Sequence, residues 1–138
     1  MSDYWLKMIG AARKPVADRW CEDEPHLLRG VRAPKRPASL KRGDYLVYYA
    51  SGFQKIFAIA KCSGNGADAP EVGGKGEHDW PYLLDVQVLL AIPQVKLAPD
   101  WDVLEIPSSK VMQRSYVELT EEQYKLAHAA IAGRSAIG

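Results

Sequence analysis

The residues of this sequence that could do chemistry are mostly aromatic and basic. The segment 40–52, LKRGDYLVYYASG, places Tyr45, Tyr48 and Tyr49 on one short predicted strand. A soluble chain rarely needs so many tyrosines on one strand for packing alone, although aromatic side chains often serve packing. Because an aromatic ring can stack on another flat ring, this strand is a candidate wall of a pocket for a planar ligand.

Basic residues gather just before this strand. The chain between Glu24 and Asp44 has no acidic residue and holds Arg29, Arg32, Lys35, Arg36, Lys41 and Arg42. The net charge is only +1, but residues 1–62 hold twelve Lys/Arg against six Asp/Glu, and residues 63–138 hold six against eleven. This asymmetry indicates a surface that faces a polyanion, and a basic loop that meets only solvent is the alternative.

The sequence gives little support for a metal site, a disulfide framework or a site for a nucleoside triphosphate. Cys21 and Cys62 form no Cys-x-x-Cys pair, and the three histidines are scattered, which argues against a zinc site and a disulfide framework. The glycine-rich residues 73–76 lack the spacing of a phosphate-binding P-loop. We therefore expect no metal and no cofactor.

Length and composition fit one globular domain. The chain has 138 residues, of which 47% are hydrophobic and 25% are charged, so we expect residues 1–138 to form a single domain. The longest apolar run, residues 88–92, is far too short to span a membrane, and the N-terminus lacks the order of a signal peptide. We therefore expect a cytoplasmic protein that does not contact a membrane.

Periodicity and turn residues predict one α+β domain around a small, mostly antiparallel, barrel-like sheet. The predicted strands are residues 4–9, 45–50, 55–62, 82–92 and 111–119. A short helix is expected near residues 16–21, and loops are expected at 29–43 and 62–79. A capping box at 120–123 predicts the start of a C-terminal helix, and Gly133 predicts its end.

The predicted strand at 45–50 has two apolar faces, because its side chains alternate between opposite sides. Tyr45 and Tyr49 share one face, and Tyr48 lies on the other. A strand that is apolar on both faces is expected to be buried on both sides or closed into a barrel. We expect one tyrosine face to be core and the other to face a ligand.

Short motifs occur in a particular order along nearly the whole chain. They are Tyr4-Trp5-Leu6, Gly30-Val31-Arg32, Gly43-Asp44, Tyr48-Tyr49-Ala50-Ser51, Ile56-Phe57-Ala58-Ile59-Ala60, Trp80 ahead of Asp85-Val86, Gln113-Arg114 and Leu119-Thr120-Glu121-Glu122. As a set they resemble the EVE family, a branch of the PUA-like barrels that includes the YTH domains. The chain departs from the family pattern at Leu28, where the family has Trp, and at Ala50, where it has His.

The resemblance implies a PUA-like barrel with flanking helices that binds modified nucleobases and has no chemistry of its own. The partner would be DNA or RNA, with a base that stacks on aromatic rings and hydrogen-bonds along its polar edge. The implied base-pocket residues are Tyr49, Ser51, Trp80, Val31, Arg32, Gln113 and Arg114. The residues implied to contact phosphates are Lys35, Arg36 and Lys41.

Two other functions stay open from the sequence. A protein-interaction module would use the basic segment to meet an acidic partner. A small hydrolase acting on a modified nucleoside would need a positioned acid or base, and Asp85 is the only carboxylate on a strand near the supposed pocket. The sequence leaves open the identity of the base, the choice between DNA and RNA, and the oligomeric state.

Overall fold

The computed structural model describes residues 3–10, 15–33, 40–63, 67–68, 82–106 and 116–137. The strands are β1 (Tyr4–Ile9), β2 (Gly30–Ala33), β3 (Tyr45–Ala50), β4 (Lys55–Cys62), β5 (Ala67–Asp68), β6 (Tyr82–Ala91) and β7 (Tyr116–Leu119). The α-helices are α1 (Trp20–Asp23) and α2 (Glu121–Ile137), and the 3₁₀ helices are η1 (Pro25–Leu28), η2 (Val95–Leu97) and η3 (Trp101–Leu104).

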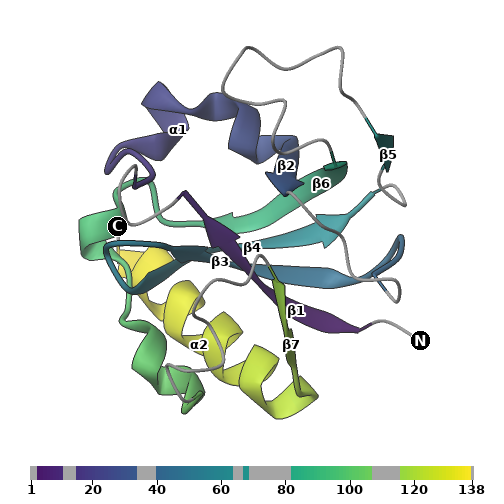
Figure 1. Ribbon diagram of the computed structural model, residues 1–138. Helices are drawn as coiled ribbons and strands as arrows, with labels where there is room; N and C mark the ends of the chain where they lie inside the picture. The colour runs from purple at the N-terminus through teal and green to yellow at the C-terminus, as the bar shows by residue number, and fades with distance from the viewer. Residues whose placement is uncertain are drawn as a thin grey trace.

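One curled sheet forms the centre of the molecule, with α1 over one face and α2 over the other (Figure 1). The strand order is β2-β6-β4-β3-β1-β7, and the short β5 pairs with β6. Only β1 and β3 run parallel among the paired strands, and the other described pairs are antiparallel. The expected mostly antiparallel α+β sheet is confirmed, and β1 and β3 are its one parallel pair among the described strands.

The central strand β3 is buried on both sides, as its two apolar faces predict. Val47 and Tyr48 point to opposite faces, and neither is exposed. Tyr48 packs against Trp20 of α1, with ring centroids 6.2 Å apart. Tyr45 lies against Tyr124 of α2, with centroids 5.3 Å apart. The two helices therefore cover the two tyrosine faces of the same strand.

The buried carboxylate of Asp44 joins the start of β3 to the start of β1. Its oxygens accept hydrogen bonds from the backbone N–H of Asp3 at 2.9 Å and from the indole N–H of Trp5 at 3.0 Å. They also accept from the backbone N–H and the ammonium of Lys41. Burial raises the pKa of Asp44, but these hydrogen bonds outweigh it and hold the pKa below its ordinary value. The network explains why β1 and β3 begin in register, with Tyr4 opposite Tyr45.

The helix α2 begins at the predicted capping box but does not end where predicted. The Thr120 hydroxyl accepts from the Gln123 N–H at 3.1 Å, and the Gln123 side chain accepts from the Thr120 N–H at 2.9 Å. Gly133 was expected to stop the helix, and this is wrong, because α2 continues to Ile137. An added Cβ at Gly133 would meet nothing within 4 Å, so the glycine sits in open space inside the helix.

Four other boundaries differ from expectation. The loop expected at 62–79 contains β5, which pairs with β6. The predicted loop at 29–43 contains β2, which pairs with β6, and the short helix lies at Trp20–Asp23 rather than near 16–21. β7 occupies only the end of the strand expected at 111–119, and residues 107–115 lie outside the described residues. Across the described ranges, no helix combines the length and the hydropathy needed to cross a membrane.

Candidate nucleic-acid interface

The turn between β3 and β4 presents Ser51, one of the expected pocket residues. The turn spans residues 51–54 and has positive φ angles of 93° at Gly52 and 58° at Gln54. The backbone N–H of Ser51 donates to the carbonyl of Ile9 at 3.1 Å, which ties the turn to the end of β1. The Ser51 side chain is half-buried, so its hydroxyl can reach a ligand at this end of the sheet.

Tyr49, expected to offer a ring to the base, is largely covered. Its ring meets the ring of Trp101 of η3 edge to face, with centroids 5.6 Å apart and planes at 81°. Only 8% of Tyr49 is exposed, and burial raises the pKa of its hydroxyl. A base could therefore contact only the small open part of this ring, and Trp101 holds the rest in place.

Tyr48 belongs to the core on the opposite face. Its hydroxyl donates to the carbonyl of Leu27 at 2.7 Å, and its ring meets Phe57 edge to face at 5.6 Å. Burial, followed by the charges of Tyr116 and Cys62, raises the pKa of Tyr48. The neighbouring tyrosines of β3 thus point into two different packed layers.

The Gly-Val-Arg segment forms β2 along the edge of β6. Val31 is 1% exposed and lies opposite Leu84, so it supports the sheet from within rather than forming an open wall. Arg32 pairs through its backbone with Leu83. The expected site residues Lys35, Arg36, Trp80, Gln113 and Arg114 lie outside the described residues.

Lys41, expected to contact phosphate, already holds two carboxylates. Its ammonium lies 3.0 Å from Asp3 and 3.0 Å from Asp44. Hydrogen bonds to Asp3 and then to Asp44 raise the pKa of Lys41. A phosphate at this position would compete with both acids, so Lys41 has a structural role at the start of β3.

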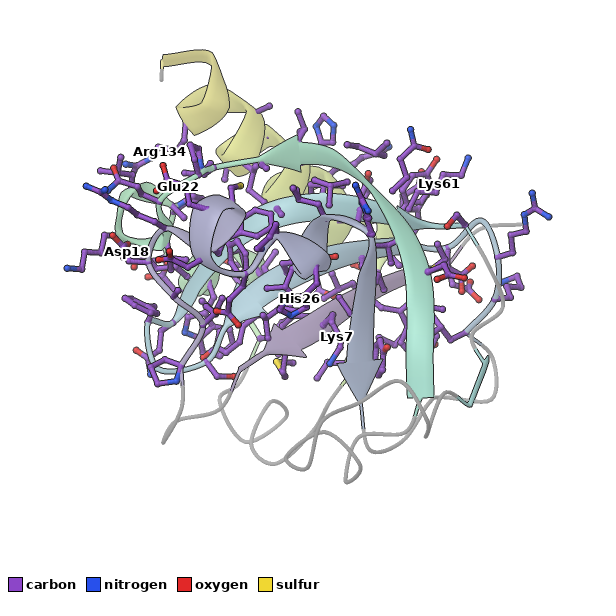
Figure 2. All side chains as sticks on the ribbon, turned by 90° about the horizontal axis from the view of Figure 1, so that it is seen from above. Lys7, Asp18, Glu22, His26, Lys61 and Arg134 are labelled. Atoms are coloured by element: carbon purple, nitrogen blue, oxygen red, sulfur yellow. The ribbon has the colours of Figure 1, made fainter. Side chains whose placement is uncertain are left out.

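A buried lysine on β1 was missed from the sequence. Lys7 is 1% exposed, and its Nζ donates to the carbonyl of Met8 at 2.8 Å. The same nitrogen lies 4.9 Å from the centre of the Tyr116 ring. Burial lowers the pKa of Lys7 to about 7. Figure 2 views the molecule from the α1 side and labels Lys7 near the middle of the view. The sequence did hold one sign of a buried lysine, which was a single basic residue among the apolar residues of the predicted first strand.

The comparisons with known proteins find a shared fold at low sequence identity. No family model matches the chain, and no curated protein does. Human THYN1, solved with 5-methylcytosine DNA, is 15% identical, with 93% of this chain and 96% of that chain covered and a TM-score of 0.53. The protein Atu2648 of Agrobacterium tumefaciens is 18% identical, with 94% and 93% covered and a TM-score of 0.53. The fold is PUA-like.

A YTH domain shares this fold as well. The YTH domain of Zygosaccharomyces rouxii MRB1, solved with N6-methyladenosine RNA, is 11% identical, with 88% of this chain and 82% of that chain covered and a TM-score of 0.50. The chain shares its fold with THYN1 and with this YTH domain, and this is the PUA-like fold that the ordered motifs predict. The two neighbours solved with nucleic acid are binding domains.

The described residues give little support for acid–base catalysis or for a metal site. Asp85 is exposed on β6, and its side chain makes no hydrogen bond or ion pair with any residue in the described ranges. Those ranges also hold no group of three His, Cys, Asp or Glu side chains that could hold a metal ion. A nucleoside hydrolase would need the Asp85 side chain to be buried and hydrogen-bonded, and among the described residues it is neither.

A hollow of about 350 Å³ is lined by none of the expected pocket residues that the structure describes. It opens between α1 and the turn after β6, and its lining residues are Arg19, Cys21, Glu22, Pro93 and Gln94. Burial, followed by the charge of Glu22, raises the pKa of the Cys21 thiol, so this thiol is protonated at neutral pH. The hollow offers no aromatic ring for stacking.

Proposed function

We propose that this PUA-like domain is a non-catalytic nucleic-acid-binding module that recognises a modified base in DNA or RNA. The observation that carries the proposal is its likeness, over most of both chains, to two domains solved with methylated nucleic acid. One of them holds 5-methylcytosine DNA and the other N6-methyladenosine RNA. The shared architecture suits a base that has left its stack, because a curled sheet with covering loops can enclose a single planar group.

Within this proposal, Trp80 supplies the stacking ring and Ser51 a hydrogen-bonding hydroxyl. Stacking of a base on an aromatic side chain is worth roughly 1–3 kcal/mol. The half-buried Ser51 is held by the turn that anchors to Ile9. Val31 and Tyr49 are almost fully buried. These two residues would act through packing, so they position the pocket rather than face the base.

Polar and basic side chains complete the proposed site. Gln113 and Arg114 would offer an amide and a guanidinium to the base edge or to its phosphate. Arg32 would line the base pocket. Lys35 and Arg36 would meet the backbone of the strand, and binding would weaken as salt rises. Lys41 contributes less than its charge suggests, because Asp3 and Asp44 already neutralise it.

The test is a titration of short single-stranded oligonucleotides that differ only in one base. One set is unmodified, one carries 5-methylcytosine and one carries N6-methyladenosine, each at two salt concentrations. Trp80→Ala and Ser51→Ala should weaken binding to the preferred modified strand. Ser63→Ala is the matched control, because Ser63 is an exposed serine at the opposite end of the hairpin. Equal binding of all strands, unaffected by Trp80→Ala, would overturn the proposal.

A further inference from the structure

Three tyrosines from three elements meet on the α2 side of the sheet. Tyr4 and Tyr45 begin the parallel strands β1 and β3 opposite each other, with ring centroids 5.8 Å apart and planes 16° apart. Tyr124, in the first turns of α2, lies 4.6 Å from Tyr4 and 5.3 Å from Tyr45. The Asp44 network and the capping box of α2 hold these elements in register, so the cluster is preorganised.

Part of the tyrosine cluster is exposed to solvent. Each of the three rings is half-buried, and none of the three hydroxyls has a hydrogen-bond partner in the described part of the chain. No buried side-chain polar atom there lacks a partner, so these hydroxyls meet solvent. Burial, followed by the charges of Tyr45 and Tyr4, raises the pKa of Tyr124 to about 12. Tyr124 is therefore neutral at physiological pH and does not repel an anion.

A cation stands beside the cluster. Lys61 pairs with Tyr45 across β3 and β4, and its Nζ lies 5.7 Å from the centre of the Tyr45 ring. Lys61 is exposed and forms no ion pair within the described ranges, whereas Lys41 and Lys55 are each held by acids. Figure 2 shows Lys61 near the outer margin of the molecule. Its charge is thus available to a ligand that reaches Tyr45.

The surroundings of the cluster extend its aromatic surface, and two acids that flank it in the sequence are each paired with a lysine. The exposed ring of His128 lies 6.0 Å from Tyr124, one turn further along α2. Asp3, which precedes Tyr4 in the chain, is paired with Lys41 at 3.0 Å, and Glu121, at the start of α2, is paired with Lys125 at 3.5 Å. This pairing reduces the repulsion that Asp3 and Glu121 would exert on a polyanion.

We propose that Tyr4, Tyr45 and Tyr124 form a second stacking surface, which takes an unmodified nucleobase of the same single strand, with Lys61 at its phosphate. Aromatic rings beside a cation match the way single strands are held without sequence preference. The inference rests on the proposed function, since it assigns the path of the strand beyond the modified base. Ser51 and Tyr45 are separated by the length of β3, about 20 Å along the strand, so only longer oligonucleotides reach both places.

The test compares Tyr124→Leu, which keeps an apolar side chain for packing, with Tyr124→Phe, which keeps the ring. Affinities are measured for single strands of two and of twelve nucleotides. Loss of one stacked base predicts at least about fivefold weaker binding of the twelve-nucleotide strand by Tyr124→Leu. Tyr124→Phe should bind the long strand within about twofold of the parent protein. The short strand cannot span the two places, so both variants should bind it within about twofold of the parent protein. Lys61→Gln should reduce the slope of log affinity against log salt by about one.

Two controls separate this surface from the proposed base pocket. Thermal unfolding of both Tyr124 variants checks that α2 stays folded, and a loss that follows unfolding rather than the ring would overturn the inference. The ratio of affinities for modified and unmodified strands should stay unchanged in Tyr124→Leu. The parent protein could bind modified and unmodified strands equally while Tyr124→Leu still weakens binding of long strands. In that case the stacking surface stands and the modified-base proposal fails. If Tyr124→Leu binds long strands as tightly as Tyr124→Phe, the stacking surface is overturned.

Discussion

Lys7 and Tyr116 face each other across the β1–β7 pair, with the lysine Nζ 4.9 Å from the centre of the tyrosine ring. The lysine is 1% exposed, so a cation lies inside the apolar packing on the α1 side of the sheet. A buried ammonium loses its hydration, and proximity to an aromatic ring restores only part of that loss. The pair therefore makes the stability of this domain depend on pH.

The first prediction concerns Lys7. Burial lowers its pKa from 10.5 to about 7, so the unfolded chain binds more protons than the folded one between these values. Stability should then rise with pH, by about 2 kcal/mol between pH 7 and 9. Above pH 9 the Cys62 thiol acts in the opposite direction, because burial, followed by the charge of Asp44, raises its pKa from 9.0 to about 12.

Urea unfolding of the parent protein and of Lys7→Met at pH 7, 8 and 9 tests this account. Methionine has a similar length and no charge to desolvate. The variant should be at least as stable as the parent at pH 7 and should lose the rise toward pH 9. A parent protein whose free energy of unfolding is flat over this range would contradict the depressed pKa.

Asp44→Asn should destabilise the domain strongly. The substitution removes a buried charge that accepts from Asp3, Trp5 and Lys41, and it turns one acceptor into a donor facing other donors. We expect a loss of about 2–4 kcal/mol in the free energy of unfolding. Asp100→Asn is the control, because its ion pair with Lys55 is exposed and should contribute less than about 1 kcal/mol. Equal effects of the two substitutions would refute the anchoring role of Asp44.

Tyr48→Phe and Tyr45→Phe should differ although both remove one hydroxyl from β3. The Tyr48 hydroxyl is buried and donates to Leu27, so its loss leaves a buried carbonyl and should cost about 1–2 kcal/mol. The Tyr45 hydroxyl has no partner among the described residues, so its loss should change stability by less than about 0.5 kcal/mol. Denaturant unfolding of both variants measures the contrast, and the reverse order would show that the two faces are wrongly assigned.

Gly133→Ala should stabilise the protein. The residue lies inside α2 with open space around its Cα, and alanine is the better helix former by about 0.5–1 kcal/mol. A glycine in the left-handed conformation of a helix end would give the opposite sign. The melting temperature of the variant therefore distinguishes a helix that runs to Ile137 from one that stops at Gly133.

Features with local causes could be predicted from the sequence. The hairpin of β3 and β4 follows from two apolar runs around a four-residue turn, and the capping box at Thr120 follows from residue types three positions apart. The start of α2 and both strands of the hairpin lie where these patterns put them. By contrast, β2 forms because it pairs with β6, about fifty residues later in the chain, so its loop-like sequence gave no sign of a strand.

The candidate site shows the same division. Alternation along β3 separates Tyr48 from Tyr49, but it cannot say that Trp101, remote in the chain, covers Tyr49. The basic segment shows Lys41 as a free cation, whereas folding brings Asp3 and Asp44 to it. The tyrosine cluster also needs the parallel register of β1 and β3. Long-range pairing decides which aromatic and basic side chains stay available to a ligand.

The affinity ratio between a methylated strand and its unmethylated twin tests the central claim most directly. One buried methyl group is worth about 0.8 kcal/mol, so the parent protein should prefer one methylated strand by at least about fourfold. Trp80→Ala should bring this ratio close to one, and Ser63→Ala should leave it unchanged. A parent ratio of one for both 5-methylcytosine and N6-methyladenosine strands, in a protein that still binds them, would contradict recognition of these modified bases.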